Sequence, residues 1–376
     1  MDLKNIVVIG PVYPYKGGIS HYTGLLYQAL AKRYNVCMVS YKMQYPKFLY
    51  KKEQKDYSND AFQIQDTKYW LNTADPLNII NTANKVNKLR PDLVIIQWWH
   101  PYFAPCYWLL THLLRRSRIM FVCHNVFPHE RFPADKLLTK MALKKGDLYI
   151  TNSKSDAEDL IKIKKDAKYQ RAVHPTYNTF RIKDLSYNQA RDMLGIGENE
   201  RILLFFGFVR PYKGLKYLLE AMPIIKGQLE RVRLWVVGDF GEDEKDYFDL
   251  INRLKIGADV ELVKGYIPDE EVEKYFSAAD LVVLPYESAT QSGIVQIAYG
   301  FEKPVVATNV GGLPEVVLEG KTGFLAAPKD PVSLADKVVT FFKQGKQREF
   351  SDNIKKESYK YSWDRMIEII ENLWKR

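Results

Sequence analysis

The chain of 376 residues repeats one pattern along its length, a short and continuously apolar strand followed by an amphipathic helix. The predicted strands are NIVVIG, NVCMVSY, DLVIIQWW, RIMFVCHN and DLYITNS in the first half, and RILLFFGFV, RLWVVGD, DVELVKGY, DLVVLPY and KPVVATN in the second. Strands that are apolar on both faces and alternate with helices are typical of parallel sheets covered on both sides. We therefore predict an α/β protein with two doubly wound, Rossmann-like domains.

The boundary between the two domains is predicted near a polar, turn-rich stretch, 175–200. We predict an N-terminal domain over 1–180, a C-terminal domain over 181–355 and a closing helix over 356–376. One side of that helix carries Trp363, Met366, Ile370 and Trp374. We expect this helix to pack back across the domain interface. Two such domains that face each other would enclose a cleft, with ligands at the carboxyl ends of the strands.

The composition describes a folded protein with a surplus of positive charge. Hydrophobic residues make up 46% and charged residues 27% of the chain, and the formal net charge is +10. This surplus is consistent with an anionic partner such as a nucleotide or a membrane surface, and equally with an ordinary solvated surface. Basic and aromatic residues do not form an interleaved stripe, so we do not expect nucleic acid as a partner.

The cysteines and the apolar segments indicate the cellular compartment of the protein. Cys37, Cys106 and Cys123 lie in apolar or aromatic runs without a CxxC pair, which indicates buried thiols in a reducing compartment. The N-terminus leads directly into a strand and lacks the features of a signal peptide. No apolar run reaches the ~18 residues that span a bilayer. We expect a cytoplasmic protein that is either soluble or peripheral to the membrane.

Two groups of residues at predicted strand ends of the first half are candidates for a site. Gly17 and Gly18 precede a helix, where a ligand can approach the backbone and a helix N-terminus favours anions; an ordinary tight turn is the alternative. The spacing is not GxGxxG, so it does not indicate a dinucleotide site. His124 and Asn125 follow another strand, where His124 is either a cleft residue or a structural histidine.

In the second half, the segment GFVRPYKG follows the first predicted strand, with Gly207 at its start. Arg210 and Lys213 lie three residues apart just before a helix, and Gly214 precedes that helix. A guanidinium and an ammonium group at this place suit a diphosphate, and a solvated basic turn is the alternative.

The loop ATQSG, residues 289–293, lies between a strand and a helix and carries no charged side chain. The backbone N–H groups at the start of the helix would offer donors and a partial positive charge to a phosphate. The residues that would supply them are Gln291, Ser292, Gly293 and Ile294. We expect Arg210 and Lys213 to close over the same phosphates from the neighbouring strand.

Taken together, these motifs resemble family 4 of the retaining glycosyltransferases, which have the GT-B fold. The matching segments are GG at 17–18, HN at 124–125, GFVRPYKG at 207–214, GYIPDEEVEKYFSAADLVVLP at 265–285, KPVVATNVGGLPEVV at 303–317, FLAAPKDPVSLA at 324–335 and YSWDRM at 361–366. The similarity extends over nearly the whole chain. The order and spacing of the C-terminal segments are specific, whereas the N-terminal segments are less so.

The resemblance implies that the two domains bind different substrates. The C-terminal domain of such enzymes holds a nucleotide-sugar donor, and the N-terminal domain holds the acceptor. By position, Arg210 and Lys213 would bind the donor diphosphate, while Tyr266 and Ile267 would lie along the base. Gly17 and Gly18 would approach the donor phosphate or the acceptor. His124 would lie beside the transferred sugar.

One departure from the family pattern concerns recognition of the sugar. The family usually has a glutamate near the start of the 289–293 loop and a second one eight residues later. Ala289 and Ile297 occupy those places here, and Glu287 lies two residues before the first of them. Glu287 could substitute only if the loop shifts. Thr290 and Gln291 would otherwise recognise sugar and phosphate through neutral hydrogen bonds.

The resulting prediction is a retaining, metal-independent glycosyltransferase without a cofactor, which uses a UDP- or GDP-linked sugar as donor. No DxD motif lies at a strand end, which is why we expect no metal ion. The acceptor would be a saccharide hydroxyl, with the lipid-linked saccharides of bacterial cell-surface polysaccharide or glycolipid assembly favoured. Two alternatives stay open: a non-catalytic protein that binds sugar nucleotides, and a GT-B-fold epimerase or phosphorylase.

The acceptor side is suggested by the segment 42–55, which mixes lysines with Phe48, Leu49 and Tyr50. Basic and aromatic residues together suit an anionic bilayer surface, here the inner face of the plasma membrane; a loop folded onto its own domain is the alternative. The residues that could line an acceptor cleft, or else belong to the core, are Trp98, Trp99, His100 and Tyr102, and we add Asn125.

Overall fold

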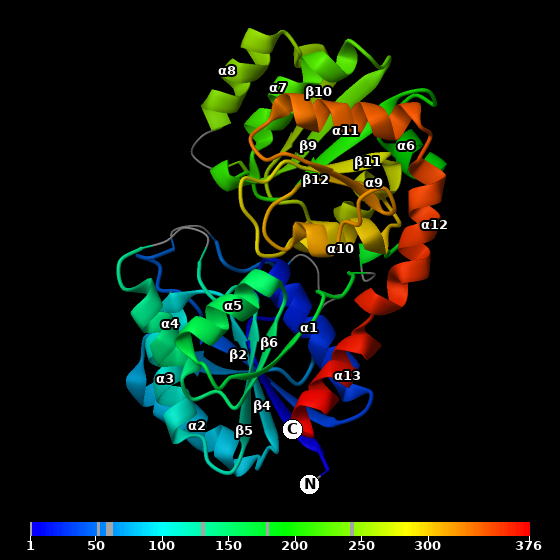
Figure 1. Ribbon diagram of the computed structural model, residues 1–376. Coiled ribbons are helices and arrows are strands. Elements are labelled where there is room, and N and C mark those ends of the chain that lie inside the picture. The colour runs from blue at the N-terminus through cyan, green and yellow to red at the C-terminus, as the bar shows by residue number, and fades with distance from the viewer. Residues whose placement is uncertain (1, 51–52, 58–62, 129–131, 178–179, 241–243) are drawn as a thin grey trace. The chain divides into compact units, whose positions relative to one another are not determined.

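The computed structural model describes residues 2–50, 53–57, 63–128, 132–177, 180–240 and 244–376. The chain forms two compact units (Figure 1). The first consists of Met1–Val173 together with Ser362–Arg376, and the second is His174–Tyr361. The division thus falls seven residues before the position expected at 180, and the closing helix belongs with the N-terminal unit.

The N-terminal unit is built on a parallel sheet with the strand order β3-β2-β1-β4-β5-β6-β7. Its strands are β1 (Asn5–Ile9), β2 (Asn35–Met43), β3 (Lys68–Asn72), β4 (Leu93–Trp98), β5 (Arg118–Cys123), β6 (Leu148–Thr151) and β7 (Lys168–Arg171). The central strands β1 and β4 are buried along almost their whole length, as their apolar sequences require. The edge strands β3 and β7 carry mixed sequences, KYWLN and KYQR.

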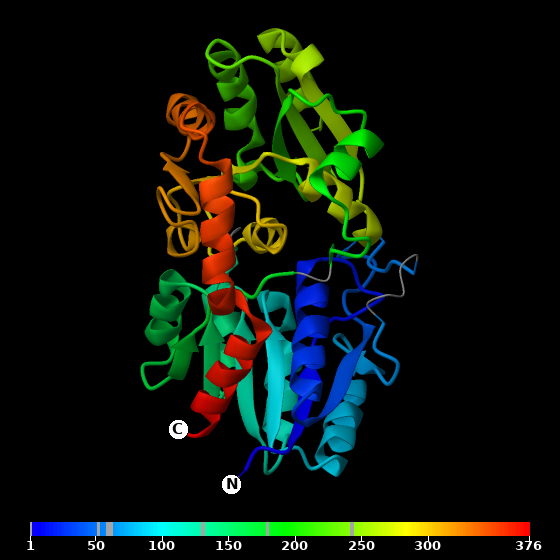
Figure 2. The ribbon, with the colours of Figure 1, turned by 90° about the vertical axis from the view of Figure 1, so that its right-hand side faces the viewer.

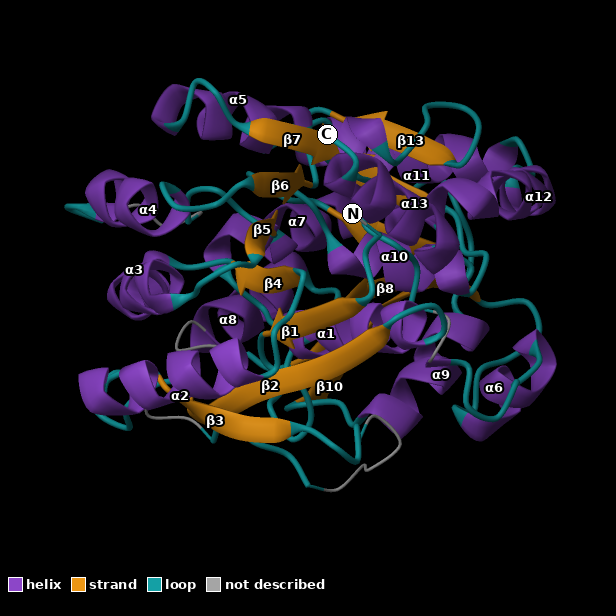
Figure 3. Cartoon of the chain, turned by 90° about the horizontal axis from the view of Figure 1, so that it is seen from below, coloured by secondary structure: helices purple, strands orange, loops and turns teal. Residues whose placement is uncertain are grey.

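Helices cover both faces of this sheet (Figure 3). They are α1 (Gly18–Ala31), α2 (Pro76–Lys88), η1 (Pro101–Phe103), α3 (Ala104–Leu113), α4 (Asp135–Leu143), α5 (Lys154–Ile163) and α13 (Trp363–Trp374). Helices α2, α3 and α4 pack side by side on one face, and α13 lies along α1 on the other (Figure 2). The Tyr22 ring of α1 contacts the Trp363 ring of α13 at a centroid distance of 5.1 Å.

The C-terminal unit contains a second parallel sheet with the order β10-β9-β8-β11-β12-β13. Its strands are β8 (Arg201–Phe206), β9 (Val232–Gly238), β10 (Val260–Lys264), β11 (Leu281–Leu284), β12 (Val305–Thr308) and β13 (Gly323–Ala326). Its helices are α6 (Tyr187–Met193), η3 (Pro211–Lys213), α7 (Leu215–Lys226), α8 (Glu244–Leu254), η4 (Gly257–Asp259), α9 (Asp269–Ala278), α10 (Gly293–Gly300), η5 (Leu313–Glu315), α11 (Pro331–Lys343), α12 (Gln347–Glu357) and η6 (Ser358–Tyr361).

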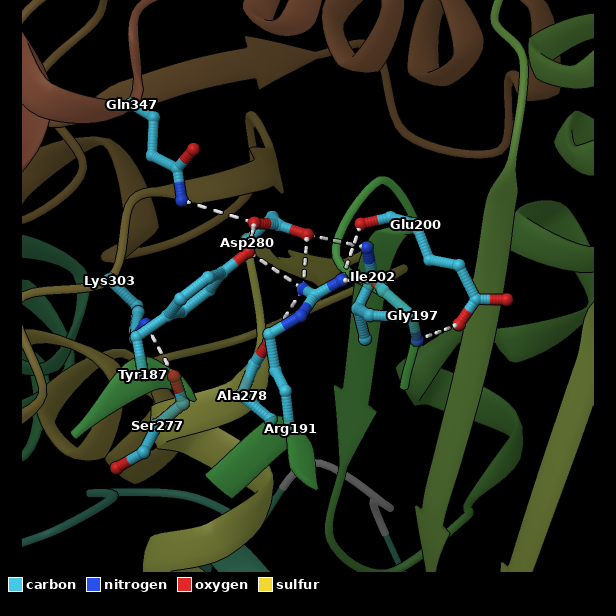
Figure 4. A network of polar contacts seen from close by, with 10 residues as sticks. All are labelled: Tyr187, Arg191, Gly197, Glu200, Ile202, Ser277, Ala278, Asp280, Lys303 and Gln347. Atoms are coloured by element: carbon cyan, nitrogen blue, oxygen red, sulfur yellow. Dashed lines mark hydrogen bonds and ion pairs between the residues drawn. The ribbon is translucent and has the colours of Figure 1, made fainter. Parts of the chain in front are cut away.

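A buried polar network fastens the C-terminal unit at the amino ends of β8 and β11 (Figure 4). The Arg191 guanidinium lies 3.4 Å from the Asp280 carboxylate, and both side chains are almost completely buried. Arg191 also donates to the carbonyl oxygens of Gly197 and Glu200. The Asp280 carboxylate accepts from the Ile202 amide at 2.7 Å and from the Tyr187 hydroxyl and the Gln347 amide. One ion pair thereby ties α6, β8, β11 and α12 together.

Candidate functional site

The carboxyl end of β8 brings three predicted site residues together. Gly207 has a φ of 103°, which favours glycine, and it follows the strand directly. A Cβ atom at this position would lie 3.2 Å from the Lys213 Nζ atom and 3.4 Å from the Ile294 Cδ1 atom. The ammonium group of Lys213 and the first turn of α10 therefore both lie close to Gly207.

The Lys213 ammonium group occupies a partly buried position. Burial lowers the pKa of Lys213 to about 8, with a further contribution from the positive charge of Arg210. The Nζ atom lies 5.9 Å from the centroid of the Tyr286 ring. In the described part of the chain, neither Arg210 nor Lys213 forms an ion pair with a carboxylate. Two neighbouring cations without a protein counter-ion are an arrangement suited to an anionic ligand.

Backbone contacts hold the loops around these cations in place. Gly214 has a φ of 66° and directly precedes α7, and a Cβ atom there would overlap the Pro285 carbonyl oxygen. Gly311 has a φ of 50°, and a Cβ atom there would overlap the Ala289 carbonyl oxygen. Glycine is thus required at both positions. The loops that follow β8, β11 and β12 meet at one edge of the sheet.

Helix α10 begins at Gly293, directly after the loop for which backbone donors are predicted. Ser292 precedes the helix in an extended conformation, and its side chain does not cap the helix amides. Its hydroxyl lies instead 3.2 Å from the Tyr286 hydroxyl. Thr290, Gln291 and Gly293 are partly exposed. The N-terminal amides of α10 lie at the same sheet edge as Lys213, so the positive end of the helix and the two cations can act on one anion.

Glu287 has partners of its own within the C-terminal unit. The Tyr217 hydroxyl donates to its carboxylate at 2.9 Å, and the Lys216 and Lys329 ammonium groups lie at 3.5 and 3.0 Å. Partial burial raises the pKa of Glu287, but the hydrogen bonds from Lys329 and Tyr217 and the charge of Lys216 outweigh it, so the pKa lies below its ordinary value. Glu287 is a carboxylate engaged in a local ion-pair cluster.

The loop after β10 contains Tyr266 and Ile267, both of which are partly exposed. Gly265, which precedes them, has a φ of 108° and donates its amide to the Gly238 carbonyl oxygen at 3.0 Å. A Cβ atom at Gly238 would overlap the Gly207 carbonyl oxygen. The ends of β8, β9 and β10 are therefore close together, which places Tyr266 and Ile267 along the same sheet edge as Gly207.

In the N-terminal unit, the turn at Gly17 and Gly18 begins helix α1. Gly17 has a φ of 104°, and none of the residues that the structure describes has an atom within 4 Å of where its Cβ atom would be. The backbone conformation favours glycine. No side chain caps the amides of the helix at Gly17. A ligand role for this turn stays a prediction.

His124 is buried at the end of β5 and has a partner that sequence reasoning missed. Its Nε2 atom lies 2.8 Å from the Oε1 atom of Gln97, which is fully buried on β4. The Tyr22 ring contacts the His124 ring edge-to-face at 4.7 Å. A Cβ atom at Gly10 would lie 2.5 Å from the Gln97 side chain, so glycine makes room for this glutamine. The sequence could have indicated this partner, because Gln97 is a polar residue within the apolar run DLVIIQWW.

The aromatic residues predicted for the acceptor lie in different environments. Trp98 is fully buried and donates its indole N–H to the Val126 carbonyl oxygen, so it belongs to the core and has no free face for a sugar. Trp99 is partly exposed and donates to the Tyr45 hydroxyl at 3.2 Å. Burial lowers the pKa of His100. The Tyr102 hydroxyl lies 2.9 Å from that of Thr73, and Asn125 is partly exposed.

Three further findings concern cysteines, metals and membranes. Cys37 is partly buried, Cys106 and Cys123 are buried, and all three are free thiols. Among the described residues, no group of three or more His, Cys, Asp and Glu side chains could hold a metal ion. Within that same part of the chain, every helix is too short or too polar to traverse a lipid bilayer.

Comparison with known proteins identifies the family. The family model described as "Glycosyltransferase Family 4" matches residues 16–179, and that described as "Glycosyl transferases group 1" matches residues 186–361. An uncharacterized glycosyltransferase of Methanocaldococcus jannaschii is 34% identical over 49% of this chain and 47% of its own. The lipopolysaccharide 1,2-N-acetylglucosaminetransferase of Salmonella typhimurium is 29% identical over 49% of this chain and 51% of its own. The chain thus aligns with about half the length of these relatives.

Solved structures resemble the chain over its full length. Sucrose-phosphate synthase from Thermosynechococcus elongatus superposes with a TM-score of 0.74 at 18% identity, over 99% of this chain and 98% of its own. The Anabaena protein HepE in complex with UDP-glucose superposes with a TM-score of 0.75 at 19% identity, over 99% and 100%. Both likenesses concern the fold. With the two family models covering nearly the whole sequence, the chain belongs to family 4 of the glycosyltransferases, the glycosyl transferases of group 1, and has the GT-B fold.

Proposed function

We propose that the protein transfers a sugar from a nucleotide diphosphate sugar to a hydroxyl group of a saccharide acceptor, with retention of configuration. The observation that carries this proposal is the pair of neighbouring cations, Arg210 and Lys213, which have no carboxylate partner among the described residues; Lys213 lies near the first turn of α10. Such an arrangement suits the diphosphate of the donor. The family membership supplies the reaction class.

In the reaction, the bond between C1 of the sugar and the oxygen of the diphosphate breaks, and its electron pair stays on the diphosphate. The oxygen of the acceptor hydroxyl forms the new bond to C1, and its proton passes to the departing phosphate on the same face. Arg210, Lys213 and the first amides of α10 would stabilise the negative charge that develops on the leaving group. His124, held by Gln97, would contact the transferred sugar.

For the donor, we propose a UDP- or GDP-linked sugar, with Tyr266 and Ile267 along the base and Gly17 and Gly18 near a phosphate or the acceptor. The structural neighbour HepE binds UDP-glucose, which supports a UDP-linked donor. Thr290 and Gln291 would recognise the sugar and its phosphate by neutral hydrogen bonds, in place of the family's first glutamate.

A comparison of Gln291→Ala with Glu287→Ala tests which side chain recognises the donor. We expect Gln291→Ala to raise the donor KM about tenfold, the loss of roughly one hydrogen bond. Glu287→Ala should change the donor KM less, because its carboxylate is already held by Tyr217, Lys216 and Lys329. Steady-state kinetics with the same donor would measure both. The reverse order would assign the role of the family's first glutamate to Glu287.

For the acceptor, we propose a lipid-linked saccharide in bacterial cell-surface polysaccharide or glycolipid assembly, used at the inner face of the plasma membrane. The support is the segment 42–55, of which residues 51–52 lie outside the described part. Phe48 and Leu49 have 78% and 55% of their surface exposed, and the Tyr50 ring stacks on that of Tyr45. Trp99, His100, Tyr102 and Asn125 would line the acceptor site.

Replacing Phe48, Leu49 and Tyr50 together by serine tests the membrane contact of this segment. We expect affinity for vesicles that contain anionic lipid to fall about tenfold or more, because exposed apolar and aromatic side chains anchor proteins at the interface. Vesicle flotation would measure it, and the fold should be unchanged because the three side chains are exposed. Equal flotation of the two proteins would remove this segment from the membrane contact.

The experiment that tests the proposed function is a mass-spectrometric screen of UDP-, GDP- and dTDP-linked sugars. A glycosyltransferase should hydrolyse its proper donor slowly without acceptor, releasing the free nucleoside diphosphate. Nucleotide binding without release, for all donors and acceptors tested, would favour a non-catalytic sugar-nucleotide-binding protein, which the missing glutamate pair also suggests. Conversion of a donor into an isomeric sugar nucleotide would identify an epimerase.

A further inference from the structure

The layer of helices α2, α3 and α4 presents an unusual outer face in the N-terminal unit (Figure 3). Each helix buries one side against the sheet and exposes apolar side chains on the other. Leu77 of α2 and Leu137 of α4 have 78% and 68% of their surface exposed, and Trp108 of α3 has 42%. Ile80 and Phe132 add to the same layer. We call this surface the α2–α4 face.

Positive side chains predominate on the α2–α4 face, which is flanked by the acidic residues Asp75 at the N-cap of α2 and Asp147 beyond the end of α4. The exposed or partly exposed basic side chains of the three helices and their C-terminal ends are Lys85, Lys88, Arg115, Arg116, Lys136, Lys140, Lys144 and Lys145. Within the helices themselves the only acidic residue is Asp135, and it is buried. None of these basic side chains forms an ion pair with a described carboxylate. The face therefore combines apolar groups with uncompensated positive charge.

The neighbouring helix α5 shows the ordinary arrangement by contrast. Its exposed Lys154 and Lys162 pair with Glu158 and Asp159 at 4.0 and 2.8 Å. On the opposite side of the sheet, Arg33 of the α1 end pairs with Asp364 of α13 at 3.0 Å. Compensated charges of this kind suit a surface that faces water. The α2–α4 face therefore differs from these two helix surfaces in lacking ion pairs among its described residues.

The α2–α4 face is continuous with the residues proposed for the acceptor. The Tyr50 ring stacks on Tyr45, whose ring lies 4.9 Å from that of Tyr102 in η1, just before α3. The His100 ring in turn stacks on Phe132, just before α4, at 5.9 Å. The two sets of ring contacts are joined by the Tyr102 amide, which donates to the His100 Nδ1 atom at 3.1 Å. The 48–50 segment is thereby connected through the loop after β4 to Phe132 on the α2–α4 face.

We propose that the α2–α4 face is the surface by which the protein lies on an anionic lipid bilayer, with Leu77, Trp108 and Leu137 at the acyl boundary and the lysines and arginines among the headgroups. Apolar side chains interleaved with unpaired basic ones, with no exposed acidic residue in the three helices, match the chemistry of such a surface. A lipid-linked acceptor, as in the proposed function on which this rests, would then meet His100 and Tyr102 beside the headgroups.

Two matched variants test the proposal by flotation of the full chain with vesicles of phosphatidylcholine alone or with roughly one third phosphatidylglycerol. The wild-type protein should float with the anionic vesicles only. Replacing Leu77, Trp108 and Leu137 by serine should weaken that binding about tenfold or more. Replacing Lys136 and Lys140 by glutamine should weaken it by roughly fivefold per charge, with a matching loss of salt dependence.

The control replaces three exposed apolar residues of the C-terminal unit, Ile182, Met193 and Val332, by serine and should leave flotation unchanged. Equal binding of the α2–α4 variants and the wild type, or an equal loss in the control, would overturn the proposal, as would binding to an acidic protein or nucleic acid but not to vesicles. Donor hydrolysis without vesicles is measured on each variant. If all proteins that still float lacked donor hydrolysis, the result would contradict the proposed function and leave the membrane proposal standing.

Discussion

Replacing Lys213 by alanine is expected to lower kcat/KM for the donor about 10²–10³-fold while the fold stays intact. The ammonium group lies next to Gly207 and Ile294, where it would meet the charge that develops on the leaving diphosphate. Arg210→Ala should act in the same direction, because Arg210 is exposed and belongs to the same loop. Steady-state kinetics and circular dichroism would separate lost catalysis from lost structure. Near-normal turnover of both variants would contradict the assignment of Arg210 and Lys213 to the donor diphosphate.

The control for this experiment is Lys226→Ala, which removes the same charge from the opposite end of α7, where Lys226 pairs with Asp259. It should leave the kinetics unchanged. The wild-type protein should also show a pH dependence. Because the pKa of Lys213 is lowered to about 8, its proton is lost as the pH rises through that value. Donor affinity should then fall by up to about tenfold per pH unit above 8, and Lys213→Ala should abolish this dependence.

Replacing Arg191 by methionine is expected to reduce the free energy of unfolding by about 3–5 kcal/mol, since removing one partner of a buried ion pair leaves the other charge in the protein interior. Asp280 would keep its bonds to Ile202, Tyr187 and Gln347 but lose its cation. The carbonyl oxygens of Gly197 and Glu200 would lose their donor as well. Urea denaturation followed by fluorescence would measure the effect.

The comparison for Arg191 is Lys346→Met, which removes a cation from the surface pair with Glu349 in the same unit. An exposed pair at this spacing contributes about 0.5 kcal/mol or less. A loss below about 1 kcal/mol for Arg191→Met would show that the network contributes little net stability. Because the network lies at the amino ends of β8 and β11, donor binding at the opposite sheet edge should be unaffected under native conditions.

The sequence predicts the interior of both sheets well because the central strands are apolar on both faces. The strands it missed, β3, β7 and β13, are at the sheet edges. Edge strands are covered less completely, so KYWLN and KYQR carry mixed side chains, and GFLA is too short to show a period. The parallel order of the central strands follows from their separation by helices.

The loops of the candidate site were predicted from glycines and cations that follow apolar strands, since the carboxyl ends of parallel strands lie at one edge of a sheet. The choice between Trp98 and Trp99 was not predicted, because adjacent residues of a strand point to opposite faces and the sequence does not say which is interior. Trp98 is in the core and Trp99 is partly exposed. Gln97 was missed for a related reason, since its function depends on His124, which reaches it from a neighbouring strand.

The placement of α13 has a consequence for how the protein can be divided. The chain passes from the first unit to the second at 173–174 and returns at 361–362, so the N-terminal unit is discontinuous in sequence. A fragment that stops at residue 173 would lack α13 and expose the apolar side of α1 around Tyr22, whose hydroxyl contacts Met366. An autonomous N-terminal unit therefore requires residues 362–376 to be spliced onto 1–173, whereas the C-terminal unit can be excised as one continuous piece.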